Sequence, residues 1–113
     1  MKTYKQKGNS TLLILNHKTS AKVLIKNVIL IKGEINYTKF YLECGREKTV
    51  AHSIKFFEPH LETHGFLRVH RTFMINPNHV RKYDAEQEIL TMSNGQKANI
   101  SRRRRFVLKD LVE

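Results

Sequence analysis

The segment with the clearest chemical potential runs from Phe66 to Asn76 and reads FLRVHRTFMIN. Apolar side chains alternate in its first half with Arg68, His70 and Arg71, whose side chains favour water or an anion. A segment that buries one edge and presents cations on the other is suited to holding phosphate. Pro77 follows and lacks a backbone N–H, so it ends any regular hydrogen-bond ladder at that point.

A run of four arginines, Arg102–Arg105, is the second basic feature. Successive residues of a helix point about 100° apart, so at most two of these side chains can face one DNA groove. Cations in the first turn of a helix oppose the helix dipole by a few tenths of a kcal/mol each, roughly. Helix stability therefore does not account for the run. It indicates contact with nucleic acid, and the alternatives are a solvated basic face or a nuclear-type targeting signal.

Composition supports a polyanionic partner. The 113 residues include 21 Lys and Arg against 10 Asp and Glu, which gives a formal net charge of +11. Such an excess favours nucleic acid first and an acidic membrane second, although it carries no information about the fold. The length predicts a single domain over residues 1–113, with residues 1–10 as a basic arm or an edge strand.

Enzymatic and metal-binding patterns are weak. His60 and His64 have the spacing of a helical metal pair, but no further cluster of ligands accompanies them and Pro59 interrupts a regular helix. The single cysteine, Cys44, lies in no nucleophile signature, and the five glycines form no phosphate-binding loop. We therefore expect no catalytic residues, no metal, no cofactor and no small-molecule substrate.

Targeting signals are also weak. No apolar run approaches the roughly 20 residues that a membrane-spanning helix needs, and the basic N-terminus lacks the apolar core of a signal peptide. We expect no membrane association and a cytoplasmic location.

Short apolar runs separated by turn residues predict strands, and a change to helical spacing predicts two short helices. The expected strands cover residues 11–15, 21–25, 28–33, 38–43, 48–51, 88–92 and 97–100, and the expected helices cover 53–61 and 102–112. Within 28–33, we expect Ile29 and Ile31 on one face and Val28 and Leu30 on the other. Asn94-Gly95 predicts a type I′ turn. The fold class is mainly β.

The segment Phe66–Asn76 resembles the central signature of LytTR-type DNA-binding domains, which reads approximately F-x-R-x-H-R-S-x-x-[IV]-N. Val80 and Tyr83 match the aliphatic and aromatic positions that follow this signature in the family. Ser101-Arg102-Arg103 is similar to the terminal S-R-R. The resemblance extends from about residue 20 to the end of the chain.

This resemblance implies an elongated assembly of antiparallel sheets with two short helices, which binds double-stranded DNA through loops at the ends of sheets. By position, Thr38, Arg71 and Arg102 would contact bases. The implied phosphate contacts are Asn36, Tyr37, Lys39, Arg68, His70, Thr72, Ser101, Arg103 and Arg104. For His70 two roles stay open, a structural one in holding the loop and a direct contact with DNA, and Asn76 is expected to be structural. The short Thr38, the apolar Ile35 and the additional arginines depart from the family pattern.

The leading hypothesis is a sequence-specific bacterial transcription regulator that occupies tandem DNA sites and could form a homodimer on DNA. One alternative is a basic RNA-binding β domain, whose mark would be exposed aromatic residues on a sheet face. Another is a protein-interaction module on the same fold. Nothing in the chain resembles a receiver domain, and Met1 favours a stand-alone module over a piece of a larger regulator.

Overall fold

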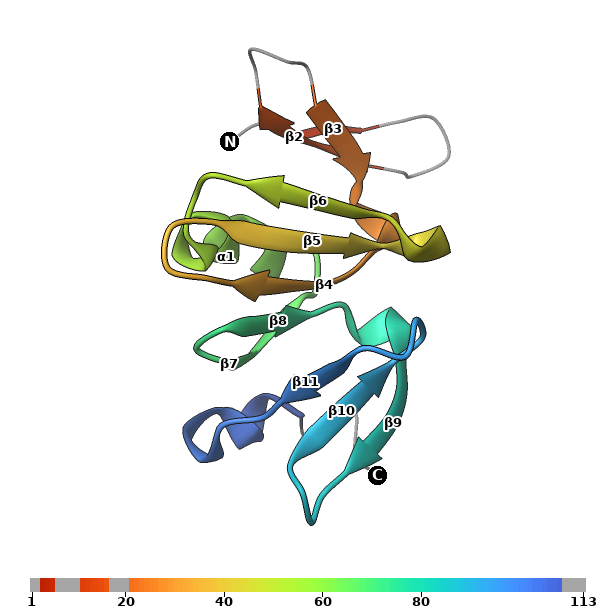
Figure 1. The fold of residues 1–113 in the computed structure, drawn as a ribbon, viewed down its shortest axis with the longest axis vertical. Helices are drawn as coiled ribbons and strands as arrows, with labels where there is room; N and C mark the ends of the chain where they lie inside the picture. Colours follow the sequence, from red (N-terminus) through yellow and green to blue (C-terminus); the bar gives the residue numbers. More distant parts are fainter. Residues whose placement is uncertain (1–2, 6–10, 17–20, 109–113) are drawn as a thin grey trace.

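The computed structural model describes residues 3–5, 11–16 and 21–108, which form three antiparallel sheets arranged one after another along the longest axis (Figure 1). The first sheet has the order β1-β2-β3, the second β6-β5-β4-β8-β7 and the third β11-β10-β9. The strands are β1 (Thr3–Lys5), β2 (Thr11–Asn16), β3 (Ala21–Leu24), β4 (Val28–Gly33), β5 (Thr38–Leu42), β6 (Glu47–Val50), β7 (Leu67–His70), β8 (Phe73–Ile75), β9 (Val80–Asp84), β10 (Ile89–Met92) and β11 (Lys97–Asn99). The mainly β fold is confirmed.

Helices are few and short. The α-helix α1 (Ile54–Glu62) packs against the five-stranded sheet, and four 3₁₀ helices complete the described chain. These are η1 (Ile25–Asn27), η2 (Glu43–Gly45), η3 (Pro77–His79) and η4 (Arg102–Leu108). The predicted C-terminal helix is thus a 3₁₀ helix up to Leu108, and its last predicted residues lie outside the described part of the chain. No helix in the described ranges is long and apolar enough to cross a membrane.

The sequence of α1 explains how it packs. Ile54, Phe57 and Leu61 recur at helical spacing and are all buried. The ring of Phe57 meets that of Phe40 edge to face, with centroids 4.9 Å apart. Ser53 occupies the N-cap position, although its side chain makes no capping hydrogen bond.

The central strand β4 contributes to two hydrophobic cores, one on each side of the sheet. The predicted alternation within it is wrong. The pairing of β4 with β5 shifts register between Val28 and Leu30, so Val28 and Ile31 enter the first core, whereas Ile29 and Leu30 enter the second. Such a bulge adds one residue and reverses the faces of the side chains beyond it.

The β10–β11 hairpin is confirmed, but its turn differs from the predicted type. Among the described loop residues, Gly95 has a positive φ of 87°, whereas Asn94 does not have one. Met92 N–H donates to the carbonyl of Gln96 (2.8 Å), which leaves three residues in the loop. A three-residue hairpin loop needs only one left-handed residue, and Gly95 supplies it.

Candidate nucleic-acid interface

Three segments that are distant in sequence meet along one edge of the molecule, and we call them together the basic edge: the β4–β5 loop (residues 34–37), the β7–β8 turn (71–72) and the segment 101–108 that contains η4. The N–H of Gly33 donates to the carbonyl of Thr72 (2.7 Å), and the N–H of Ser101 donates to the carbonyl of Val69 (2.8 Å). In Figure 1 all three segments lie on the left side. The ends of two sheets therefore contribute to one surface.

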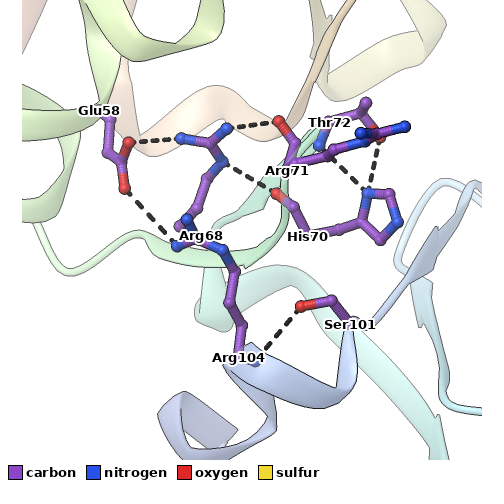
Figure 2. Close-up of polar contacts among 7 residues, drawn as sticks. All are labelled: Glu58, Arg68, His70, Arg71, Thr72, Ser101 and Arg104. Atoms are coloured by element: carbon purple, nitrogen blue, oxygen red, sulfur yellow. Dashed lines mark hydrogen bonds and ion pairs between the residues drawn. The ribbon is translucent and has the colours of Figure 1, made fainter.

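Arg68 holds the β7–β8 turn from inside the protein. Its side chain is only 5% exposed. The Nε atom donates to the carbonyl of His70 (2.9 Å), and the two terminal nitrogens donate to the carbonyl of Arg71 and to the carboxylate of Glu58 (Figure 2). The predicted phosphate contact at Arg68 is therefore not supported, because its guanidinium is buried and already bonded. Its observed position makes it a support for the turn.

His70 is held in one orientation by the turn that follows it. Its Nδ1 accepts a hydrogen bond from the N–H of Thr72 (3.1 Å), and the Thr72 hydroxyl lies 2.9 Å from the same atom. Burial lowers the pKa of His70, and the positive charges of Arg71, Arg68 and Arg104 lower it further. With Nδ1 accepting, the neutral ring carries its proton on Nε2, which leaves that N–H as a donor.

Protonation of His70 should destabilise the fold. The pKa of His70 in the folded protein lies below its ordinary value of 6.5, so the unfolded chain binds the proton first as the pH falls. Its contribution to stability is present above pH 6.5 and is lost as the pH falls through the folded pKa. Urea unfolding at pH 7.5 and at pH 5.0 should therefore show a smaller loss of stability for His70→Asn than for the original protein. Equal losses would contradict this assignment. Comparing the two proteins cancels contributions from other groups, such as His60, whose pKa is also lowered by burial.

A groove of about 420 Å³ separates the β7–β8 turn from η4. It is lined by His70, Arg71, Ser101, Arg103, Arg104 and Phe106. Among the residues that the structure describes, no carboxylate lines it. Three guanidinium groups and a hydrogen-bond donor on His70 around one opening favour an anion such as a phosphate group.

The 3₁₀ helix η4 is anchored at its start. Ser101 accepts from the N–H of Arg104 through both its hydroxyl (3.2 Å) and its carbonyl (3.1 Å), so it caps the helix as predicted. Nη1 of Arg104 lies 3.9 Å from the carboxylate of Glu58, which also binds Arg68 (Figure 2). Glu58 therefore connects η4 to the support of the β7–β8 turn. The side chain of Arg102, by contrast, is 88% exposed.

Thr38 does not lie where a base contact requires it. Its side chain is fully buried, and its hydroxyl donates to the carbonyl of His52 (2.7 Å). A buried and bonded hydroxyl cannot reach a base, so this prediction is not supported. The alternating pattern of β5 could have predicted that Thr38 is buried, because Thr38, Phe40 and Leu42 share the buried face of the strand.

The neighbours of Thr38 are more accessible. Ile35 is 93% exposed at the tip of the β4–β5 loop, Asn36 is exposed and Tyr37 is 37% exposed. Lys39 is half-buried on β5. The loop therefore presents its exposed residues immediately before the strand begins. Asn76 is buried in the structural role predicted for it, since it donates to the carbonyl of Val28 (3.0 Å) and accepts from the N–H of Asn78.

The sequence profile of the LytTR DNA-binding domain matches residues 18–113. The chain belongs to the LytTR family of DNA-binding domains. Its fold is similar to that of a LytTR DNA-binding domain from a Bacillus cereus protein described as a methyl-accepting/DNA response regulator. The TM-score is 0.69 at 24% identity, over 97% of this chain and 94% of the other. The search of curated proteins found no significant match. DNA binding in transcription regulation is therefore the general function of this LytTR domain.

Two acidic residues of this LytTR domain pair with its arginines and were not predicted as part of the site. Glu58 pairs with Arg68 and Arg104, and Glu88 pairs with Arg102 and Arg105. No local motif identifies either glutamate, because the partners are at least 10 residues apart in sequence. A basic segment that keeps a defined shape requires negative charges nearby. This general requirement predicts that acidic partners exist, but it does not identify which glutamates they are.

Proposed function

We propose that this LytTR domain is a transcription regulator that binds double-stranded DNA with sequence specificity through the basic edge. The observation that carries the proposal is the convergence of the β4–β5 loop, the β7–β8 turn and η4 on one side of the molecule (Figure 1). Backbone hydrogen bonds join these segments, so they would face a duplex as one continuous surface.

Arg102 and Arg71 are the proposed base contacts. The side chain of Arg102 is 88% exposed. An arginine can donate to guanine O6 and N7 through two parallel hydrogen bonds. Arg71 is exposed on a turn whose carbonyl groups are fixed by Arg68, so its backbone is well defined at the surface. Thr38 and Arg68 are excluded from the proposed interface because they are buried.

Phosphate groups are the proposed partners of eight further residues on the basic edge or directly beside it. These are Asn36, Tyr37, Lys39, His70, Thr72, Ser101, Arg103 and Arg104. Contacts of this kind fix the orientation of a protein on DNA without reading the sequence. Their number and their charge set the salt dependence of binding.

Two further features complete the proposal. Two copies on tandem sites bind the same side of the duplex only if the half-sites are separated by an integral number of helical turns. A homodimer on DNA would need the same spacing. A cytoplasmic location and the absence of catalytic activity go with a DNA-binding regulator, because regulated promoters lie in the bacterial cytoplasm.

The distribution of aromatic residues argues against the RNA-binding alternative. The large exposed aromatic side chains among the described residues are Tyr37, Phe56 and Phe106, which belong to a loop, to α1 and to η4. None of them lies on a sheet face. Tyr41, the other candidate for stacking, is partly buried against the second core. The second and third sheets therefore offer no platform of exposed aromatic side chains for splayed bases.

Salt dependence and competition test the proposal. Neutralising roughly 6–9 phosphates predicts a slope of about −5 to −8 for log K against log salt. Arg103→Ala should reduce the magnitude of that slope by about 1, whereas Arg81→Ala on β9, outside the basic edge, should leave it unchanged. Duplex DNA should displace a bound duplex far better than single-stranded or hairpin RNA of the same sequence. Stronger displacement by RNA would overturn the proposed function.

A further inference from the structure

Glu88 lies in the β9–β10 turn, beside the arginines of η4, which follows β11 of the same sheet. Its carboxylate is 3.7 Å from Nε of Arg102 and accepts a hydrogen bond from Nη2 of Arg105 (3.1 Å). The glutamate side chain is 22% exposed, which limits its freedom. Its backbone is also held, because the carbonyl accepts from the N–H of Ile100 (2.9 Å). Glu88 therefore occupies a defined position next to the proposed base contact.

The ion pair between Glu88 and Arg102 leaves the terminal nitrogens of the Arg102 guanidinium available for contact with a base. Glu88 lies close to Nε, on the inner side of the guanidinium. The terminal nitrogens Nη1 and Nη2 are the atoms that would form a bidentate contact with guanine O6 and N7. A carboxylate at Nε restrains a long side chain without occupying these donors. Restraint in advance reduces the entropy lost when the side chain is ordered on DNA.

The charge of Glu88 has the opposite effect on general DNA affinity. A carboxylate beside the basic edge repels phosphate and offsets part of the charge of Arg102 and Arg105. Non-specific binding depends almost entirely on such charges, whereas specific binding also depends on base contacts. One glutamate can therefore weaken binding to all sequences while it favours the sequence that Arg102 reads.

We propose that Glu88 is a specificity-determining residue that positions Arg102 for base contact and lowers the affinity for non-specific DNA. The inference rests on the proposed function, because it requires Arg102 to read a base. It assigns to Glu88 an indirect role through Arg102, without contact to the DNA.

Three variants separate charge from position. Glu88→Gln removes the charge, Glu88→Asp keeps the charge but shortens the side chain by one methylene, and Glu86→Gln removes an exposed charge from the same β9–β10 turn. Among the described residues Glu86 forms no ion pair, which makes it a matched control. Each variant is titrated with the duplex that the original protein enriches from a random DNA library and with a scrambled form of that duplex, at one salt concentration. Thermal unfolding is measured in parallel.

The proposal predicts different results for each variant. Glu88→Gln should bind the scrambled duplex several-fold more tightly and should lose about 5- to 10-fold in discrimination between the two duplexes. Glu88→Asp should lose discrimination with little change in affinity for the scrambled duplex. Glu86→Gln should gain affinity slightly for both duplexes with discrimination unchanged. If Glu88→Gln only repeats the behaviour of Glu86→Gln, or if it weakens both duplexes in parallel with a lower melting temperature, the proposal is wrong.

Combination with Arg102→Ala distinguishes failure of this inference from failure of the proposed function. If Glu88 acts through Arg102, Glu88→Gln should cause no further loss of discrimination in the Arg102→Ala background. A full additional loss there would overturn the inference while sequence-specific binding stands. If Arg102→Ala alone leaves discrimination unchanged, the role proposed for Arg102 fails, and the inference fails with it.

Discussion

Arg68→Ala is expected to lower the free energy of unfolding by about 3 kcal/mol, the largest effect of any substitution considered for this domain. Arg68 is buried and donates to two carbonyl groups of the β7–β8 turn and to the carboxylate of Glu58. Alanine would leave these acceptors without their donor in a poorly solvated site, and it would also leave a cavity. Urea unfolding monitored by circular dichroism measures the loss.

Two controls make this prediction specific. Arg81→Ala removes an exposed arginine from β9 and should change stability by less than about 0.5 kcal/mol. Arg68→Lys keeps the charge but cannot reproduce three directed hydrogen bonds from one planar group, so it should recover only part of the loss. An Arg68→Ala protein as stable as Arg81→Ala would show that the buried network does not stabilise the turn.

Arg102→Ala is expected to reduce the preference for the selected DNA sequence by about 1–3 kcal/mol, which is roughly 5- to 150-fold. Stability should not change, because the side chain of Arg102 is 88% exposed and its ion pair with Glu88 is at the surface. Titration against a panel of duplexes, each with one base pair changed, should show that the preference disappears at one position. At the other positions the preference should remain.

Lys39→Ala provides the contrast. Lys39 belongs to the proposed phosphate contacts, so its loss should weaken binding to all duplexes by a similar factor and should leave the order of preference unchanged. If Arg102→Ala and Lys39→Ala have the same uniform effect, then Arg102 is not a base contact and the division of roles along the basic edge is incorrect.

The periodicity of hydrophobic residues and the positions of turn and cap residues were sufficient to predict much of the fold. The runs 28–33 and 38–43 became adjacent strands, the helical spacing of Ile54, Phe57 and Leu61 predicted α1, and Ser101 caps η4. These features depend on contacts that are local in sequence. Strands β7, β8 and β9 were not predicted. Strands β7 and β8 lie in the segment 66–76, to which no strand was assigned, and the partly exposed residues of β9 give it little hydrophobic alternation.

Predictions for individual side chains failed where the environment is set by distant residues. An arginine in a basic segment is ordinarily expected at the surface. Arg68 is buried because its guanidinium pairs with Glu58, 10 residues earlier in the sequence, and that pairing cannot be predicted from the local sequence. The faces of β4 could not be assigned because a bulge cannot be located from an apolar run. Thr38 was placed by its match to a family position, whereas the alternation of β5 indicates a buried residue. Local periodicity was the better guide to that side chain.

Selection of bound duplexes from a random DNA library tests the central claim most directly. The selected sequence and its scrambled form are then titrated at two salt concentrations. Sequence-specific binding predicts an enriched motif with an affinity at least ~10³-fold higher than that of the scramble, and a ratio that persists at the higher salt. If no motif is enriched and all affinity falls steeply with salt, the domain binds polyanions without reading their sequence, and the proposed function is contradicted.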